Sequence, residues 1–121
     1  MNTILWILQG VLTATFLMVG TVKLLQPKDQ LAARLAWVND FSPAQVKGIG
    51  ALEVLGAVGV SAPWALGVLT FFTPLGALGL AVLMLGAAVI HIRRSEPAML
   101  VGNGVLLLLA AIVATGRAGL V

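Results

Sequence analysis

The chain of 121 residues has no cysteine and very little charge. Without cysteine it cannot form disulfides, thiol redox relays, iron–sulfur clusters on its own thiolates or zinc–thiolate sites. One histidine and four acidic residues leave too few ligands for a protein-built metal site, so we expect none. Only 9% of the residues are charged, whereas soluble domains carry roughly 25%. So few charges also cannot form a basic face, which excludes nucleic acid as a partner.

Apolar residues make up 60% of the chain, and several uninterrupted runs approach the length that crosses a bilayer. A spanning helix requires ~20 apolar residues. We therefore predict one all-α domain over residues 1–121, an integral membrane four-helix bundle in contact with lipid. The expected spans are about 3–25, 43–62, 66–92 and 97–115. Pro74 leaves open whether the third span begins there or starts earlier with a kink.

The first apolar run has no Lys or Arg before it and no small-residue cleavage site after it, so we expect a retained span. Residues 28–41 separate it from the second span. Leu31, Leu35 and Val38 recur there at helical spacing, which predicts a short amphipathic helix in the interface with Trp37 at headgroup level. The alternative is a polar connector that is only partly helical. Ser42, followed by Pro43, predicts the cap of the second span.

Basic residues are distributed unevenly between the two sides of the predicted bundle. The connections after spans one and three, with their flanks, hold Lys23, Lys28, Arg34, Lys47, Arg93 and Arg94, and the other side holds only Arg117. The positive-inside rule therefore predicts cytoplasmic connections and both termini outside the cytoplasm.

Glu53 is the most informative polar residue, because it lies in the apolar run GALEVLGAVGV. A charged residue at this depth costs at least ~2.5 kcal/mol, so it should face the bundle interior and be paired or protonated. Lys23, His91 and Asn103 lie on the same side of the predicted bundle, so the four could converge on one pocket. Our full set of candidate ligand-binding residues is Glu53, Lys23, His91, Asn103, Gln9, Thr13, Gly20 and Gly56, and Glu53 and His91 are the catalytic candidates.

Each candidate also has a purely structural interpretation. Lys23 can be an orienting charge that reaches the surface, and His91 can be one more interfacial group. Asn103 can be a hydrogen-bonding link between helices. A buried Glu53 can be paired only to stabilise the fold.

Three stretches of the chain resemble the DoxX-like family of small four-span bacterial membrane proteins. They are Gly20-Thr-Val-Lys23, residues 49–59 and residues 78–94, which carry the Lys, Glu and His just described. The family takes its name from a subunit of thiosulfate:quinone oxidoreductase, and some members assemble with redox partners, although most have no assigned activity. The resemblance implies a multi-pass protein of the bacterial inner membrane.

Three functions follow as hypotheses. The first is a pocket around Glu53 that binds a quinone or another lipophilic small molecule, within a redox or stress-related assembly that includes a redox partner protein. The second is a stand-alone acid/base enzyme acting on a lipophilic substrate. The third is a structural or chaperone-like membrane partner protein. A homo-oligomer is compatible with each of them.

Overall fold

The computed structural model describes residues 2–120, and all the secondary structure in this range is helical. Its elements are α1 (Asn2–Leu25), α2 (Lys28–Ala32), the short 3-10 helix η1 (Ala36–Asp40), α3 (Pro43–Gly59), α4 (Ala62–Leu66), α5 (Phe72–Arg93) and α6 (Pro97–Arg117). Four segments are long and apolar enough to cross a membrane: α1, α3 with α4, α5, and α6. The predicted four-span helical bundle is therefore confirmed.

The ends of the spans follow local sequence signals. Ser42 caps α3: its hydroxyl accepts a hydrogen bond from the Gln45 backbone, and the Gln45 side chain accepts one from the Ser42 backbone. This capping box satisfies backbone donors that lipid could not. The third span begins at Phe72, between the two starting points that the sequence left open. Pro74 then lies in the first turn of α5, where its missing N–H removes no helical hydrogen bond.

The connection between the first two spans is amphipathic, but it forms two short helical pieces instead of one helix. Leu35, with φ −124° and ψ 85°, interrupts the helix between α2 and η1. One continuous helix would point Leu31 and Trp37 in different directions, because they are six residues apart. The break allows both side chains to turn inward, so Trp37 is buried within the protein.

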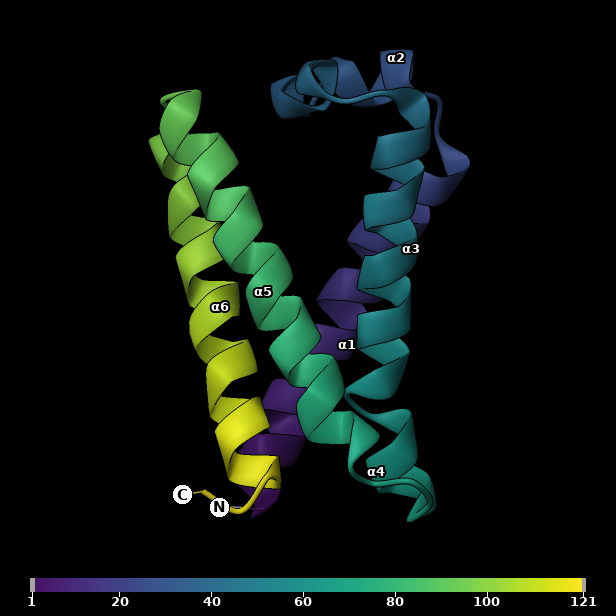
Figure 1. Ribbon diagram of the computed structural model, residues 1–121, viewed down its shortest axis with the longest axis vertical. Coiled ribbons are helices and arrows are strands. Elements are labelled where there is room, and N and C mark those ends of the chain that lie inside the picture. The colour runs from purple at the N-terminus through teal and green to yellow at the C-terminus, as the bar shows by residue number, and fades with distance from the viewer. Residues whose placement is uncertain (1, 121) are drawn as a thin grey trace.

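The long helices form two pairs, α1 with α3 and α5 with α6. Figure 1 shows the pairs converging at the end that holds α4 and the termini, and separating toward the end that α2 and η1 cover. Glycines allow the close contacts between helices. A Cβ on Gly20 would lie 2.7 Å from the carbonyl oxygen of Gly50, and a Cβ on Gly76 would lie 3.0 Å from the carbonyl carbon of Gly59. The first contact joins α1 to α3, and the second joins the two pairs.

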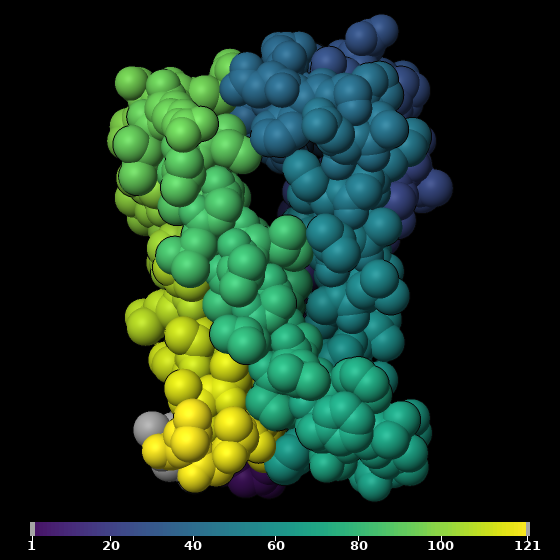
Figure 2. Space-filling model, in the orientation of Figure 1, coloured from purple at the N-terminus to yellow at the C-terminus, as the bar shows by residue number. Residues whose placement is uncertain are grey.

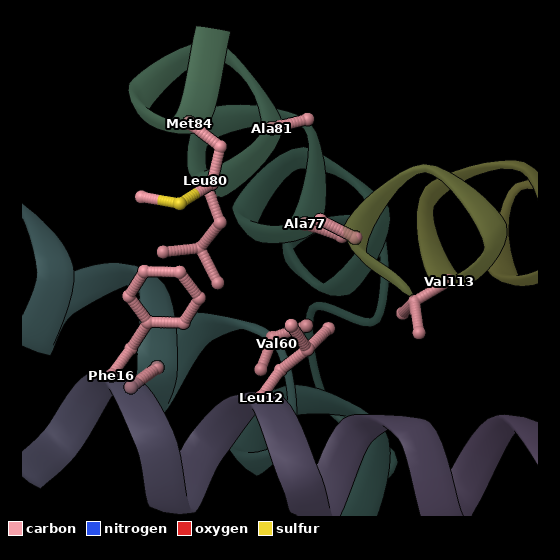
Figure 3. Close-up of a cluster of buried hydrophobic side chains, with 10 residues drawn as sticks. Leu12, Phe16, Val60, Ala77, Leu80, Ala81, Met84 and Val113 are labelled. Atoms are coloured by element: carbon pink, nitrogen blue, oxygen red, sulfur yellow. The ribbon is translucent and has the colours of Figure 1, made fainter. Parts of the chain in front are cut away.

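The main apolar core lies where the pairs converge. Leu12 and Phe16 of α1 pack there with Val60, Leu80 and Val113 (Figure 3). Many large apolar side chains on the outer faces of the long helices are more than half exposed, which suits contact with lipid. The chain is therefore a multi-pass membrane protein.

A candidate ligand site at the open end of the bundle

A cavity of about 520 Å³ lies between the separated ends of the helix pairs. Its lining is mostly apolar and comes from all four long helices and the connection before α3. Four polar side chains interrupt this lining: Lys23, Glu53, His91 and Asn103. Figure 2 shows the corresponding hollow between α5 and α3, below the connection. The structure thus brings together the four residues expected to converge, while their role in binding stays a prediction.

Lys23 and Glu53 form a buried ion pair on one wall of the cavity. Lys23 Nζ donates a hydrogen bond of 2.6 Å to Glu53 Oε1, and the side chains are only 10% and 3% exposed. The close contact of Gly20 with Gly50 lies about one turn from this pair, so it brings the α1 and α3 backbones near enough for the two side chains to meet. Together the two side chains are electrically neutral, which offsets part of the cost of removing each charge from water.

Trp37 covers this ion pair from the connection. Its ring centroid lies 5.4 Å from Lys23 Nζ, a cation–π distance, and its ring meets Phe41 edge to face at 5.7 Å. Both aromatic rings line the cavity. Sequence reasoning placed Trp37 at headgroup level and missed this position. The helical spacing of Leu31 and Leu35 gave no signal of the break that turns Trp37 inward.

The opposite wall carries His91 of α5 and Asn103 of α6. His91 Nδ1 pairs with Glu96 Oε1 at 3.0 Å, and Asn103 Nδ2 donates to the Met84 carbonyl oxygen at 2.7 Å. Asn103 therefore links α5 to α6 and also lines the cavity. Each of these side chains keeps a second polar atom, His91 Nε2 and Asn103 Oδ1, with no hydrogen bond to any residue in the described range.

The other candidate residues do not line this cavity. Gly20 and Gly56 are packing positions, since a Cβ on Gly56 would lie 2.5 Å from the Leu80 side chain. Gln9 Nε2 donates to the Val60 carbonyl oxygen at 2.8 Å, and Thr13 donates to the Ala57 carbonyl oxygen at 3.1 Å. The polar stripe of α1 runs along the whole helix, so Gln9 lies ~20 Å from Lys23 along the axis. Sharing a helix face did not mean sharing a site.

Gln9 instead belongs to a second polar cluster at the converging end. Arg117 Nε donates to Gln9 Oε1 and Arg117 Nη1 to Asn2 Oδ1, both at 2.7 Å. The guanidinium carbon lies 4.4 Å from the Trp64 ring centroid and 5.4 Å from that of Trp6. Sequence reasoning used Arg117 only to orient the chain. Its distance from Gln9 in the sequence gave no sign that the two would meet.

Residues 2–120 contain no group of three or more His, Asp or Glu placed to hold a metal ion.

Outside the spans, Arg94 Nη1 donates a 2.9 Å hydrogen bond to Asp40 Oδ1, which ties η1 to the end of α5. This hydrogen bond raises the pKa of Arg94 above its ordinary value, so the guanidinium stays charged.

A family model described as the DoxX-like family matches residues 7–113. The chain belongs to the DoxX-like family. No curated protein and no solved structure matches the chain. All four polar residues of the cavity lie within the part matched to the DoxX-like model, whereas Arg117 and Asn2 of the second cluster lie outside it. The match supports the membrane fold and assigns no role to any residue.

Proposed function

We propose that the cavity binds one uncharged lipophilic molecule with a polar head, such as a quinone. The observation that carries this proposal is the convergence of Lys23, Glu53, His91 and Asn103 on one largely apolar cavity. Ligand sites are typically apolar clefts of about 300–1,000 Å³ with a few converging polar groups. The cavity has this size and composition.

The charges and free polar atoms favour a neutral head group. Lys23 and Glu53 neutralise each other, so a charged head would lack a counter-ion there. The Lys23 ammonium has three donor protons and gives one to Glu53 Oε1, so it can donate another to a ligand oxygen. His91 Nε2 and Asn103 Oδ1 on the opposite wall are available to a second polar atom. A quinol ring fits both walls, because one oxygen can accept from Lys23 and the opposite hydroxyl can donate to His91 Nε2 or Asn103 Oδ1. The carbonyl oxygens of a quinone only accept, so a quinone is matched by Lys23 alone.

The same arrangement favours binding over catalysis by this chain alone. Lys23 and Glu53 are held by each other, so neither stands as an uncommitted acid or base. His91 Nε2 is free, but among the polar residues of the cavity it has no second uncommitted acid or base to act with. We therefore propose a membrane subunit that holds a lipophilic molecule for a redox or stress-related assembly with a protein partner. A quinone would supply electron-transfer chemistry, and the chain's own residues would bind and orient its head.

Native mass spectrometry of the protein extracted from its own membrane tests this proposal. The wild-type protein should retain a small lipophilic molecule and should bind decylubiquinone saturably when stripped. Glu53→Gln should lose both, because it replaces the charged partner of Lys23. The control is Thr13→Val, which removes the hydrogen bonds of Thr13 to Ala57 and Ser61 outside the cavity. An empty wild-type cavity that does not bind decylubiquinone would contradict the proposal.

We further propose that the protein lies in the bacterial inner membrane with the open end of the bundle toward the cytoplasm. The excess of Lys and Arg at this end supports that orientation. Reporter fusions after Leu120 should be active only when the reporter functions outside the cytoplasm. Activity of a cytoplasm-specific reporter there would reverse the orientation.

A further inference from the structure

We propose that the occupant of the cavity enters sideways from the bilayer, through an opening between α3 and α5. The opening lies in the half of these helices nearer the connection of α2 and η1, and Gly86 keeps it free of side chains. This inference rests on the proposed function and deepens it, because it defines the occupant as a membrane-dissolved amphiphile. Its apolar tail would extend through the opening into lipid while its polar head stays at Lys23 and Glu53. Three features of the cavity support this route.

The end of the cavity that faces water is closed. Leu31 and Val38 of the connection are 1% and 0% exposed, and Trp37 is 8% exposed. Trp37 and Phe41 line the cavity from this side, and Ile90 and Met99 pack against the same apolar cluster from the opposite helix pair. Asp40 forms an ion pair with Arg94, and this pair joins the connection to the end of α5. A molecule that entered from water would have to displace these packed side chains of the connection.

The opposite end of the cavity is closed by the apolar core. Phe16, which lines the cavity, is fully buried, and Leu12 and Leu80 of the same core are fully buried as well. In Figure 3 the side chains of Phe16, Leu80 and Met84 lie close together between the helix pairs. Passage toward the end that holds Arg117 would require this packing to open.

The seam between α3 and α5 is closed in the half nearer the converging end and open in the half nearer the connection of α2 and η1. The glycine contacts between these helices join residues 56–60 to residues 72–80. Farther along α5, Val82 is 59% exposed, and Val82 and Gly86 both line the cavity. A Cβ built on Gly86 would meet no atom within 4 Å. Figure 2 shows the hollow in this stretch of the seam.

Gly86 therefore differs from the packing glycines. Gly20 and Gly76 leave no room for a side chain without displacing backbone, whereas a side chain at Gly86 has space at the edge of the cavity. The helix itself does not require glycine there, because glycine lowers helix stability by ~1 kcal/mol relative to alanine. A large side chain at Gly86 would narrow the opening without disturbing the contact between helix pairs.

The fluorescence of Trp37 can test the route without any added ligand. The chain has three tryptophans, and Trp6→Phe with Trp64→Phe leaves Trp37 as the sole reporter of the cavity while keeping aromatic rings beside Arg117. The protein is reconstituted in vesicles of phosphatidylcholine with dibrominated acyl chains, and acrylamide serves as the quencher in water. The expected result is strong quenching by the brominated lipid and weak quenching by acrylamide.

Gly86→Phe in this background should lose most of the quenching by brominated lipid, and Gly86→Leu should lose part of it. The matched control is Gly104→Phe, at a glycine that also has open space around it but does not line the cavity. Equal quenching in the Gly86 and Gly104 variants would overturn the proposed opening. Stronger quenching by acrylamide than by lipid would show entry from water. If Gly102→Phe on α6 reduced the quenching by brominated lipid and the Gly86 variants did not, the opening would lie on the other seam, between α1 and α6.

The quenching experiment requires no bound ligand, so a failure of the proposed opening can be distinguished from a failure of the proposed function. Retention of decylubiquinone by the wild-type protein, lost in Glu53→Gln, would support the function even if the Gly86 variants behaved like the control. If the Gly86 variants lost quenching but the wild-type protein did not retain decylubiquinone, the opening would be supported and the proposed ligand would be contradicted.

Discussion

The two ends of the bundle each bury a cation, but they do so in different surroundings. Arg117 lies where the helix pairs converge, among Gln9, Asn2 and two tryptophan rings. Lys23 lies where the pairs separate, against Glu53 and beside a cavity. Neutral amides and aromatic faces fill the space around the first cation. The second has a carboxylate partner and open volume, so we expect the converging end to hold the fold together and the open end to carry the proposed binding.

The comparison also changes what substitution of Glu53 should do. If Glu53 had no partner, Glu53→Leu would be tolerated, because it would remove a polar group from lipid depth. The ion pair reverses this expectation, since the substitution would leave Lys23 buried and unpaired.

The largest expected effect is therefore at Lys23 and Glu53. Glu53→Leu or Lys23→Met alone should lower the free energy of unfolding by roughly 3–5 kcal/mol, because each leaves one buried charge without its partner. The double variant should regain most of that loss. Unfolding in mixed detergent micelles would measure all three proteins. Additive losses in the double variant would show that the pair is not coupled.

A smaller effect is expected at the converging end from Arg117→Lys. Lysine cannot donate to Gln9 and Asn2 in the fork geometry of arginine, so one charged hydrogen bond is lost, worth roughly 1.5–3 kcal/mol. Decylubiquinone binding should not change, because Arg117 does not line the cavity. The same unfolding assay, paired with a binding titration, separates the two effects. A loss of binding at unchanged stability would contradict the assignment of this end to the fold.

Gly20→Ala should come next, because its new methyl group would meet the Gly50 carbonyl oxygen at 2.7 Å. Forcing α1 and α3 apart should cost roughly 1–3 kcal/mol, as overpacking usually does. It should also lengthen the contact between Lys23 and Glu53 and so weaken ligand retention. Thermal unfolding and native mass spectrometry would detect both changes. An unchanged melting temperature would mean that the helices can adjust without cost.

The smallest effect is expected from Gly48→Ala, which serves as the control for Gly20. A Cβ on Gly48 meets no atom within 4 Å, although Gly48 lies on the same helix as Gly50. Alanine should therefore stabilise the helix by up to ~1 kcal/mol and leave binding unchanged. A clear destabilisation in the unfolding assay would reveal a contact that this glycine makes outside the single chain.

By itself, the sequence determined the features that depend on local chemistry. The lengths of the apolar runs and the Ser42 cap placed most ends of the spans to within a few residues, because hydrogen bonding within each helix must be complete in lipid. The depth of Glu53 in an apolar run likewise required a partner or a proton, whatever the fold.

Only the tertiary structure decided which polar groups meet. Lys23 was one of several possible neighbours of Glu53, and the close approach of α1 to α3 at Gly20 and Gly50 selected it. Gln9 shares a face with Lys23 yet lies at the other end of the bundle, with Arg117. The inward turn of Trp37 depends on the interruption of the helix at Leu35, which no local sequence pattern marked. Helix spacing fixes direction around an axis, whereas the tilt between helix pairs and the separation of their ends depend on packing between residues far apart in the chain.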